Sequence, residues 1–170
     1  LRDAIDLSKR ALGPEHAEVG GLATSLAYFL TEQGKFAEAA PVVDEALAIR
    51  LKALGPEAPQ VAGTMTVKAH LLLARHQYAE ARDLAIEAQR ILAPSMPKDS
   101  WPVAFAMNTQ GAALAQLGDY AAAERLLLES RDPLGGAPIP GLADKGRARL
   151  ADLYTAWGKP GEAYKYRPTG

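Results

Sequence analysis

The residues of this 170-residue chain that could do chemistry are few and scattered. Its three histidines are His16, His70 and His76. Two metal ligands on one helix face need a spacing of three or four residues, and no pair of these histidines has it. No serine stands in a recognisable pattern with a histidine and an acid, although such a triad need not be local in sequence. We therefore expect no catalytic residue, no cofactor and no metal ion, and hence no enzyme.

Two glycine pairs have the composition of a phosphate-binding loop but not its context. Gly20-Gly21 and Gly135-Gly136 lack the preceding strand and the following lysine that such a loop needs. Gly20-Gly21 falls near the start of an expected helix, where each glycine costs about 1 kcal/mol relative to alanine. We expect this pair to permit close packing against the preceding helix.

The overall composition is that of a globular domain without a strong charge bias. Hydrophobic residues make up 48% and charged residues 23%, and the formal net charge is -1. This balance gives no electrostatic reason to expect nucleic acid or an anionic membrane as a partner. The chain has no cysteine, which leaves its redox compartment undetermined. It has no apolar run of membrane-spanning length, and we expect a cytoplasmic protein. Leu1-Arg2-Asp3-Ala4 resembles neither a signal peptide nor a usual start, and we expect the chain to be part of a longer one.

A short turn motif recurs along the chain at a fixed spacing. In each copy a turn residue is followed two positions later by an aromatic residue and five positions later by an alanine. The copies begin at Gly34, His76, Gly118 and Gly158. The first three are 42 residues apart, and in the fourth Pro160 replaces the aromatic residue. Self-similarity at one period is typical of stacked-repeat proteins.

A second motif has the same period. Leu12-Gly13-Pro14 and Leu54-Gly55-Pro56 are also 42 residues apart, and Gly-Pro is a strong helix stop. Between these signals the apolar residues have helical spacing, and no stretch alternates long enough to be a strand. The sequence therefore predicts an all-α fold with a loop over 131–141 and a frayed end over 168–170. The helices are expected over 1–12, 17–33, 35–54, 61–75, 77–92, 103–117, 119–130 and 142–157, with a short one over 163–167.

Small residues recur where two helices of a pair must approach closely. Such positions include Ala27 and Ala69 on the first helix of a pair and Ala39 and Ala81 on the second. Large residues lie one turn away, and each such side chain contributes roughly 1.5–3 kcal/mol when buried. One hairpin cannot bury both of its faces, so stability is expected to come from stacking.

At these residues the chain resembles a tetratricopeptide repeat (TPR) protein, an α–α superhelix of antiparallel helix hairpins. More narrowly, it resembles the 42-residue variety seen in kinesin light chains and in many bacterial multi-repeat proteins, on the strength of Ala46-Leu47-Ala48-Ile49-Arg50 followed by Leu54-Gly55-Pro56. The resemblance implies a single domain over 1–170. Its units would be a half repeat over 1–16, repeats over 17–58, 59–100 and 101–141, and a degenerate or capping repeat over 142–167.

The resemblance also implies a function. In TPR proteins the first helices of the pairs line a concave groove that binds an extended segment of a partner protein. The groove positions carried over to this chain are Thr24, Tyr28, Thr66, His70, Phe105, Asn108 and Asp152. Thr24, Thr66 and Asn108 would form a polar ladder suited to a peptide backbone, or else are simply solvated polar residues. Neither Thr24 nor Tyr28 is cationic, which argues against a clamp for a terminal carboxylate.

Three points remain open from the sequence. Trp101 either packs on Met96 in the irregular segment over 94–100 before its helix or is an exposed anchor for a partner. The stretch Arg149–Pro160 resembles the end of the TPR region behind bacterial serine/threonine protein kinase domains, which implies a signalling context as the alternative to a free-standing scaffold. Self-association through an apolar face of the first helix is a further interpretation.

Overall fold

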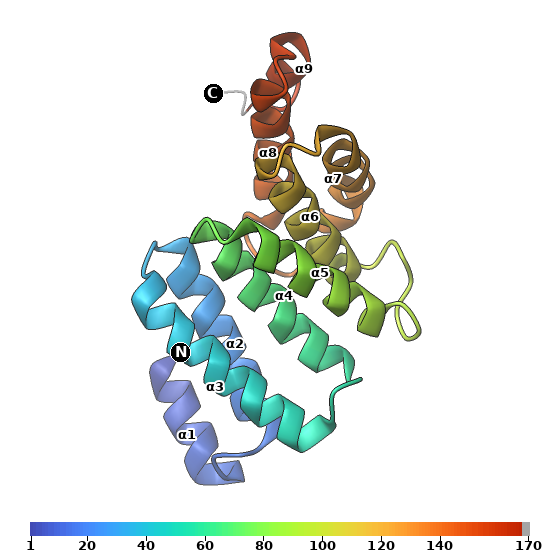
Figure 1. Ribbon diagram of the computed structural model, residues 1–170. Helices are drawn as coiled ribbons and strands as arrows, with labels where there is room; N and C mark the ends of the chain where they lie inside the picture. Colours follow the sequence, from blue (N-terminus) through green and yellow to red (C-terminus); the bar gives the residue numbers. More distant parts are fainter. Residues whose placement is uncertain (168–170) are drawn as a thin grey trace.

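The computed structural model describes residues 1–167, and all regular structure in that range is helical (Figure 1). This confirms the predicted all-α class. The helices are α1 (Arg2–Leu12), α2 (Ala17–Glu32), α3 (Phe36–Leu54), α4 (Pro59–Ala74), α5 (Tyr78–Leu92), α6 (Trp101–Gln116), α7 (Tyr120–Leu134), α8 (Leu142–Ala156) and α9 (Pro160–Tyr164). Within the described range, no helix combines the length and apolarity needed to cross a membrane. The frayed end expected over 168–170 lies outside the described residues.

The helices form hairpins, and the recurring turn residue closes each one. Gly34, Gly118 and Gly158 have φ between 72° and 86°, a left-handed conformation that glycine adopts without steric cost. His76 stands at the equivalent turn and is held at φ 62° despite its side chain. The period seen in the sequence is therefore the period of one backbone conformation.

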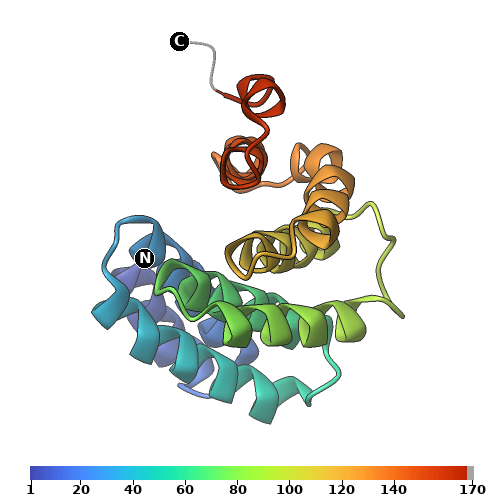
Figure 2. The same ribbon diagram turned by 45° about the horizontal axis from the view of Figure 1, so that its top comes forward.

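The hairpins stack side by side along an arc, with α2, α4 and α6 as successive neighbours (Figure 2). The small residues expected at the close approaches are fully buried, among them Ala27, Ala39, Ala69 and Ala81. Larger side chains fill the space between hairpins in successive core clusters along the stack, so stacking buries the faces that a single hairpin would leave open.

Gly20 and Gly21 permit a close approach, but to the following helix rather than the preceding one. A Cβ on Gly20 would lie 2.8 Å from Cγ of Arg50 and 3.2 Å from the carbonyl oxygen of Ala46, both on α3. A Cβ on Gly21 would lie 2.8 Å from Nη2 of Arg50. The glycine pair therefore makes room for the Arg50 side chain.

The loop expected over 131–141 is too long. Helix α7 continues to Leu134, with Pro133 in its last turn, because the Leu134 side chain is buried against the core. The remaining segment over 135–141, here called the connector, packs Ala137 and Ile139 against that same core. Helix α9 also begins three residues earlier than expected, at Pro160.

Candidate functional site

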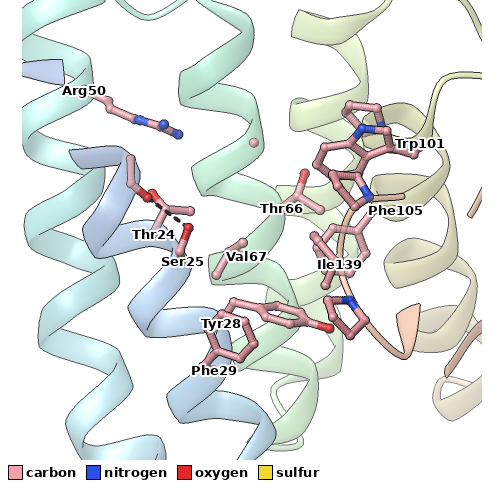
Figure 3. A pocket seen from close by; sticks show the side chains of 15 residues that line it. Thr24, Ser25, Tyr28, Phe29, Arg50, Thr66, Val67, Trp101, Phe105 and Ile139 are labelled. Atoms are coloured by element: carbon pink, nitrogen blue, oxygen red, sulfur yellow. Dashed lines mark hydrogen bonds between the residues drawn. The ribbon is translucent and has the colours of Figure 1, made fainter. Parts of the chain in front are cut away.

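The first helices of the hairpins and the connector enclose a pocket of about 400 Å³, here called the groove pocket (Figure 3). Its lining is Gly21, Thr24, Ser25, Tyr28 and Phe29 on α2, Arg50 on α3, Gly63, Thr66 and Val67 on α4, Trp101, Pro102 and Phe105 on α6, and Pro138, Ile139 and Pro140 on the connector. Aromatic, aliphatic and proline side chains form most of this wall. Its chemistry suits an apolar side chain more than a charged one.

The two threonines of the expected polar ladder line this pocket, but their hydroxyl groups already have partners. Thr24 Oγ1 donates to the carbonyl oxygen of Gly20 at 2.7 Å and lies 3.0 Å from Thr64 Oγ1. Thr66 Oγ1 donates to the carbonyl oxygen of Ala62 at 3.0 Å. A peptide backbone in the pocket would therefore share hydroxyl groups that are already bonded, rather than meet free donors.

Three rings meet at the inner end of the groove pocket. Tyr28 stacks on His70 with ring centroids 5.7 Å apart and meets Phe105 edge to face at 6.0 Å. His70 and Phe105 are also 5.7 Å apart. All three side chains are buried, and they join α2, α4 and α6 in one aromatic contact.

His70 is bonded on both ring nitrogens. Nε2 lies 2.8 Å from the Glu32 carboxylate, and Nδ1 lies 2.9 Å from Nη2 of Arg149. Because arginine donates hydrogen bonds and does not accept them, Nδ1 is the acceptor and the ring proton sits on Nε2. Burial lowers the pKa of His70 to about 4, against the hydrogen bond that Nε2 donates to Glu32, which raises it. The ring is therefore neutral near pH 7.

Arg149 continues this arrangement into α6 and α7. Its Nη1 donates to Oδ1 of Asn108 at 2.7 Å, and Nδ2 of Asn108 donates to Oγ of Ser130 at 3.0 Å. Asn108 and Ser130 are fully buried. Ser130 Oγ in turn donates to the carbonyl oxygen of Leu127, so every side-chain polar atom of Asn108 and Ser130 is satisfied within the fold.

Lys145 completes the set at the outer end. Its Nζ lies 2.8 Å from the Glu32 carboxylate. Burial alone would raise the pKa of Glu32, but the hydrogen bonds from His70 and Lys145 together lower it to about 2. We call the six residues Glu32, His70, Asn108, Ser130, Lys145 and Arg149 the groove network.

The residues carried over as groove positions thus fall into three places. Thr24, Tyr28, Thr66 and Phe105 line the groove pocket. His70 and Asn108 lie beneath α8, bonded to Arg149. Asp152 is exposed and lines a separate hollow of about 250 Å³ on the other side of Arg149, beside Ala112 and His76.

Arg50 is a site residue that the sequence did not single out. Its Nη1 donates to the carbonyl oxygen of Gln60 at 2.8 Å and to Thr64 Oγ1 at 3.0 Å. Its Nε is buried without a hydrogen-bond partner. Figure 3 shows this guanidinium at the end of the groove pocket away from Trp101. The glycine pair on α2 was the signal, because only a residue without a side chain leaves this space.

Trp101 begins α6 at the place that Ala17 and Pro59 have in earlier hairpins, and its half-buried ring lines the groove pocket. The role of Trp101 as an anchor for a partner stays a prediction. Among residues 1–167, no three His, Asp or Glu side chains are grouped so that they could hold a metal ion.

Comparison with known proteins places the chain by fold. Residues 18–93 match the tetratricopeptide repeat family model. No curated protein matches the chain in sequence. One similar solved structure consists of TPR-like repeats, nearly identical to one another, that are named for a kinesin light chain of Podosopora anserina. It shares 21% identity with this chain at a TM-score of 0.69, over 89% of this chain and 72% of its own. BtubC (BKLC) from P. vanneervenii shares 19% identity at a TM-score of 0.70, over 97% of this chain and 66% of its own. The chain is thus an all-helical, TPR-like array of helix hairpins whose fold resembles the repeats of kinesin-light-chain-like proteins.

Proposed function

We propose that the chain is a non-catalytic interaction module and that the groove pocket receives an apolar side chain from an extended segment of a partner protein. Tetratricopeptide repeats are generally protein-interaction modules, which supports the general class. The observation that carries the specific site is the groove pocket itself, whose lining includes Tyr28 on α2 and Trp101 and Phe105 on α6. Aromatic side chains around a concave pocket are typical of sites that anchor a partner residue.

The carried-over groove residues enter this proposal in two groups. Thr24, Tyr28, Thr66 and Phe105 are proposed to contact the partner directly. His70 and Asn108 lie under α8 and are proposed to contact it only when α8 moves. Asp152 is proposed to contact the part of the segment that continues past α8 into the second hollow.

A pocket-filling variant tests the site. Gly63 lines the groove pocket, and a Cβ placed on it meets no atom within 4 Å. We would select dodecapeptides from a random display library on the wild-type chain and measure their affinity for Gly63→Leu. Gly161→Leu is the matched control, because Gly161 has equally open space but lies on α9.

We expect the selected peptides to bind Gly63→Leu at least tenfold more weakly than wild type and to bind Gly161→Leu unchanged. Trp101 gives a direct optical readout in a Trp157→Phe background, since the chain has two tryptophans. Equal binding to Gly63→Leu, or a library that yields no binder, would remove the groove pocket as the site.

The residue pattern of Arg149–Pro160 favours a second proposal, in which this module is the regulatory or substrate-recruiting region of a bacterial serine/threonine protein kinase. The coding sequence upstream of Leu1 tests it. A protein kinase domain there supports the proposal, and a different domain or only further repeats contradicts it.

A further inference from the structure

The N-terminal half of helix α8 bonds through its side chains to helices far from it in the sequence. Lys145 bonds to Glu32 on α2, and Arg149 bonds to His70 on α4 and to Asn108 on α6. In a simple stack each hairpin contacts its neighbours. Here one helix of the last hairpin closes the groove back onto the first complete one.

We propose that α8 is a latch, held shut by Lys145 and Arg149, and that its release opens the covered half of the groove, including His70 and Asn108, to a partner segment. This deepens the proposed function and rests on it for the partner, although the latch itself needs no partner.

The two faces of α8 differ in the way a movable element requires. Towards α7 and α9 it is apolar, with Leu150 and Leu153 fully buried in the last core cluster. Towards α2 and α4 it has the polar bonds of Lys145 and Arg149, and its first residue, Leu142, is fully buried in the core cluster that contains Tyr28 and Phe105. From Lys145 onward the α2–α4 side can therefore exchange polar bonds for water, while the α7–α9 side keeps its core and Leu142 holds the start of the helix.

The approach of α8 to the groove depends on one small residue. A Cβ on Gly146 would lie 2.9 Å from Cδ1 of Leu134 and 3.6 Å from Nδ2 of Asn108. Gly146 therefore lets the helix pass close above Asn108, where Arg149 reaches it.

Protonation of His70 supplies a chemical trigger for release. Nδ1 accepts from Arg149 only while the ring is neutral, and burial holds the pKa of His70 near 4. The charged or titratable groups that face the ring are Glu32 and Tyr28 from α2 and Lys145 and Arg149 from α8. A second proton would set three cations against one carboxylate and break the Arg149 bond, so acid should open the latch.

A distance measurement across the groove tests this proposal. The chain has no cysteine, so Gln33→Cys at the C-cap of α2 and Ala148→Cys on α8, both exposed, can carry two spin labels without further changes. Pulsed electron paramagnetic resonance then compares this labelled chain with the same chain carrying Arg149→Met. Arg147→Met is the matched control, because Arg147 is on the same helix and pairs only with Asp144 among the described ion pairs.

We expect Arg149→Met to lengthen the label distance by about 5 Å, one helical turn, or more, and to broaden its distribution, with unchanged far-ultraviolet circular dichroism. Arg147→Met should leave the distance as in wild type, and wild type should lengthen reversibly between pH 7.5 and about pH 3.5, where a group with a pKa near 4 is mostly protonated. An unchanged distance in folded Arg149→Met overturns the latch. So does loss of the whole helical signal in that variant, since α8 would then be inseparable from the fold.

This measurement uses no partner, so it can fail while peptide binding to the groove pocket succeeds. Conversely, if the latch opens but no peptide binds at any pH, α8 is mobile and the proposed partner is unsupported. The latch further predicts that peptides selected on wild type bind Arg149→Met at least threefold more tightly if they use the covered half of the groove.

Discussion

Lys145 on α8 donates to the carboxylate of Glu32 on α2 at 2.8 Å, across 113 residues of sequence. The Lys145 side chain is 28% exposed and that of Glu32 is 30% exposed. The pair is therefore partly screened by solvent, yet it joins the first complete hairpin to the last one. The contribution of this ion pair to stability decides whether the chain can also adopt an open form or is always closed.

We expect Lys145→Met to lower the free energy of unfolding by less than about 1 kcal/mol, because half-exposed ion pairs contribute little. Glu32→Gln should cost more, on the order of 1–2 kcal/mol, since Glu32 accepts from both His70 and Lys145. Urea denaturation measures both values, and Arg147→Met is the matched surface control. A larger loss in Lys145→Met than in Glu32→Gln would contradict this ranking.

The stability of the chain should fall in mild acid because of His70. An unfolded histidine binds a proton near pH 6.5, whereas His70 in the fold does so near pH 4. Between these values the unfolded state binds more protons, so the free energy of unfolding rises with pH. The contribution is complete above pH 6.5, and about 3 kcal/mol of it is lost by pH 4. Glu32, with its pKa near 2, adds a further loss as the pH falls from 4.5 towards 2.

Urea denaturation at a series of pH values measures this slope, and His70→Gln is the comparison. Glutamine keeps a donor for Glu32 but does not titrate, so its curve should be flatter between pH 6.5 and pH 4. His16 and His76 are exposed and serve as internal controls when replaced. The same slope in wild type and in His70→Gln would show that another group governs the acid response.

The sequence predicted the hairpin array well because that part of the fold repeats. The turn at Gly34 and the stop at Gly55 each impose one backbone conformation, and their period carries it along the chain. The extension of α7 into the expected loop was not predictable in this way. Pro133 is a helix breaker by local rules, but burial of Leu134 favours one more turn of α7.

The closing of the groove was not predictable from the repeat, because it depends on residues that do not repeat. Glu32 corresponds to Ala74 one period later, and Arg149 stands where Thr109 stands in the preceding hairpin. A single charged residue at one position of one repeat is a weak signal when its partner in the fold is unknown. Ser130 is likewise a polar residue at a fully buried position of α7, and it bonds to Asn108.

The helical glycines give a prediction that separates close packing from empty space. Gly20→Ala should destabilise the fold by about 1–3 kcal/mol, because its new methyl group would meet Arg50 and Ala46 of α3. Gly63→Ala should instead stabilise it by about 0.5–1 kcal/mol, since its helical position is open on the groove side. Thermal or urea denaturation of the two variants measures the contrast, and the same sign for both would contradict it.

His76 offers the reverse test at a turn. Its φ of 62° is costly for a residue with a side chain, and the equivalent turns use Gly34 and Gly118. His76→Gly should therefore stabilise the chain by about 0.5–1 kcal/mol, although it loses the exposed 2.6 Å contact between Nδ1 and the Tyr78 hydroxyl group. Tyr78→Phe removes that contact alone and should change stability by less than about 0.5 kcal/mol.

Gly34→Ala and Gly118→Ala are the matched controls, and each should destabilise the chain by about 1 kcal/mol, because alanine at positive φ is strained. Urea denaturation of the three turn variants then measures the cost of a side chain at positive φ, because one variant removes a side chain there and two add one. If His76→Gly were as destabilising as the two alanine variants, the side chain of His76 would be holding its turn through contacts stronger than the exposed bond to Tyr78. The departure from glycine at this turn would then be a stabilising feature of the second hairpin rather than a tolerated strain.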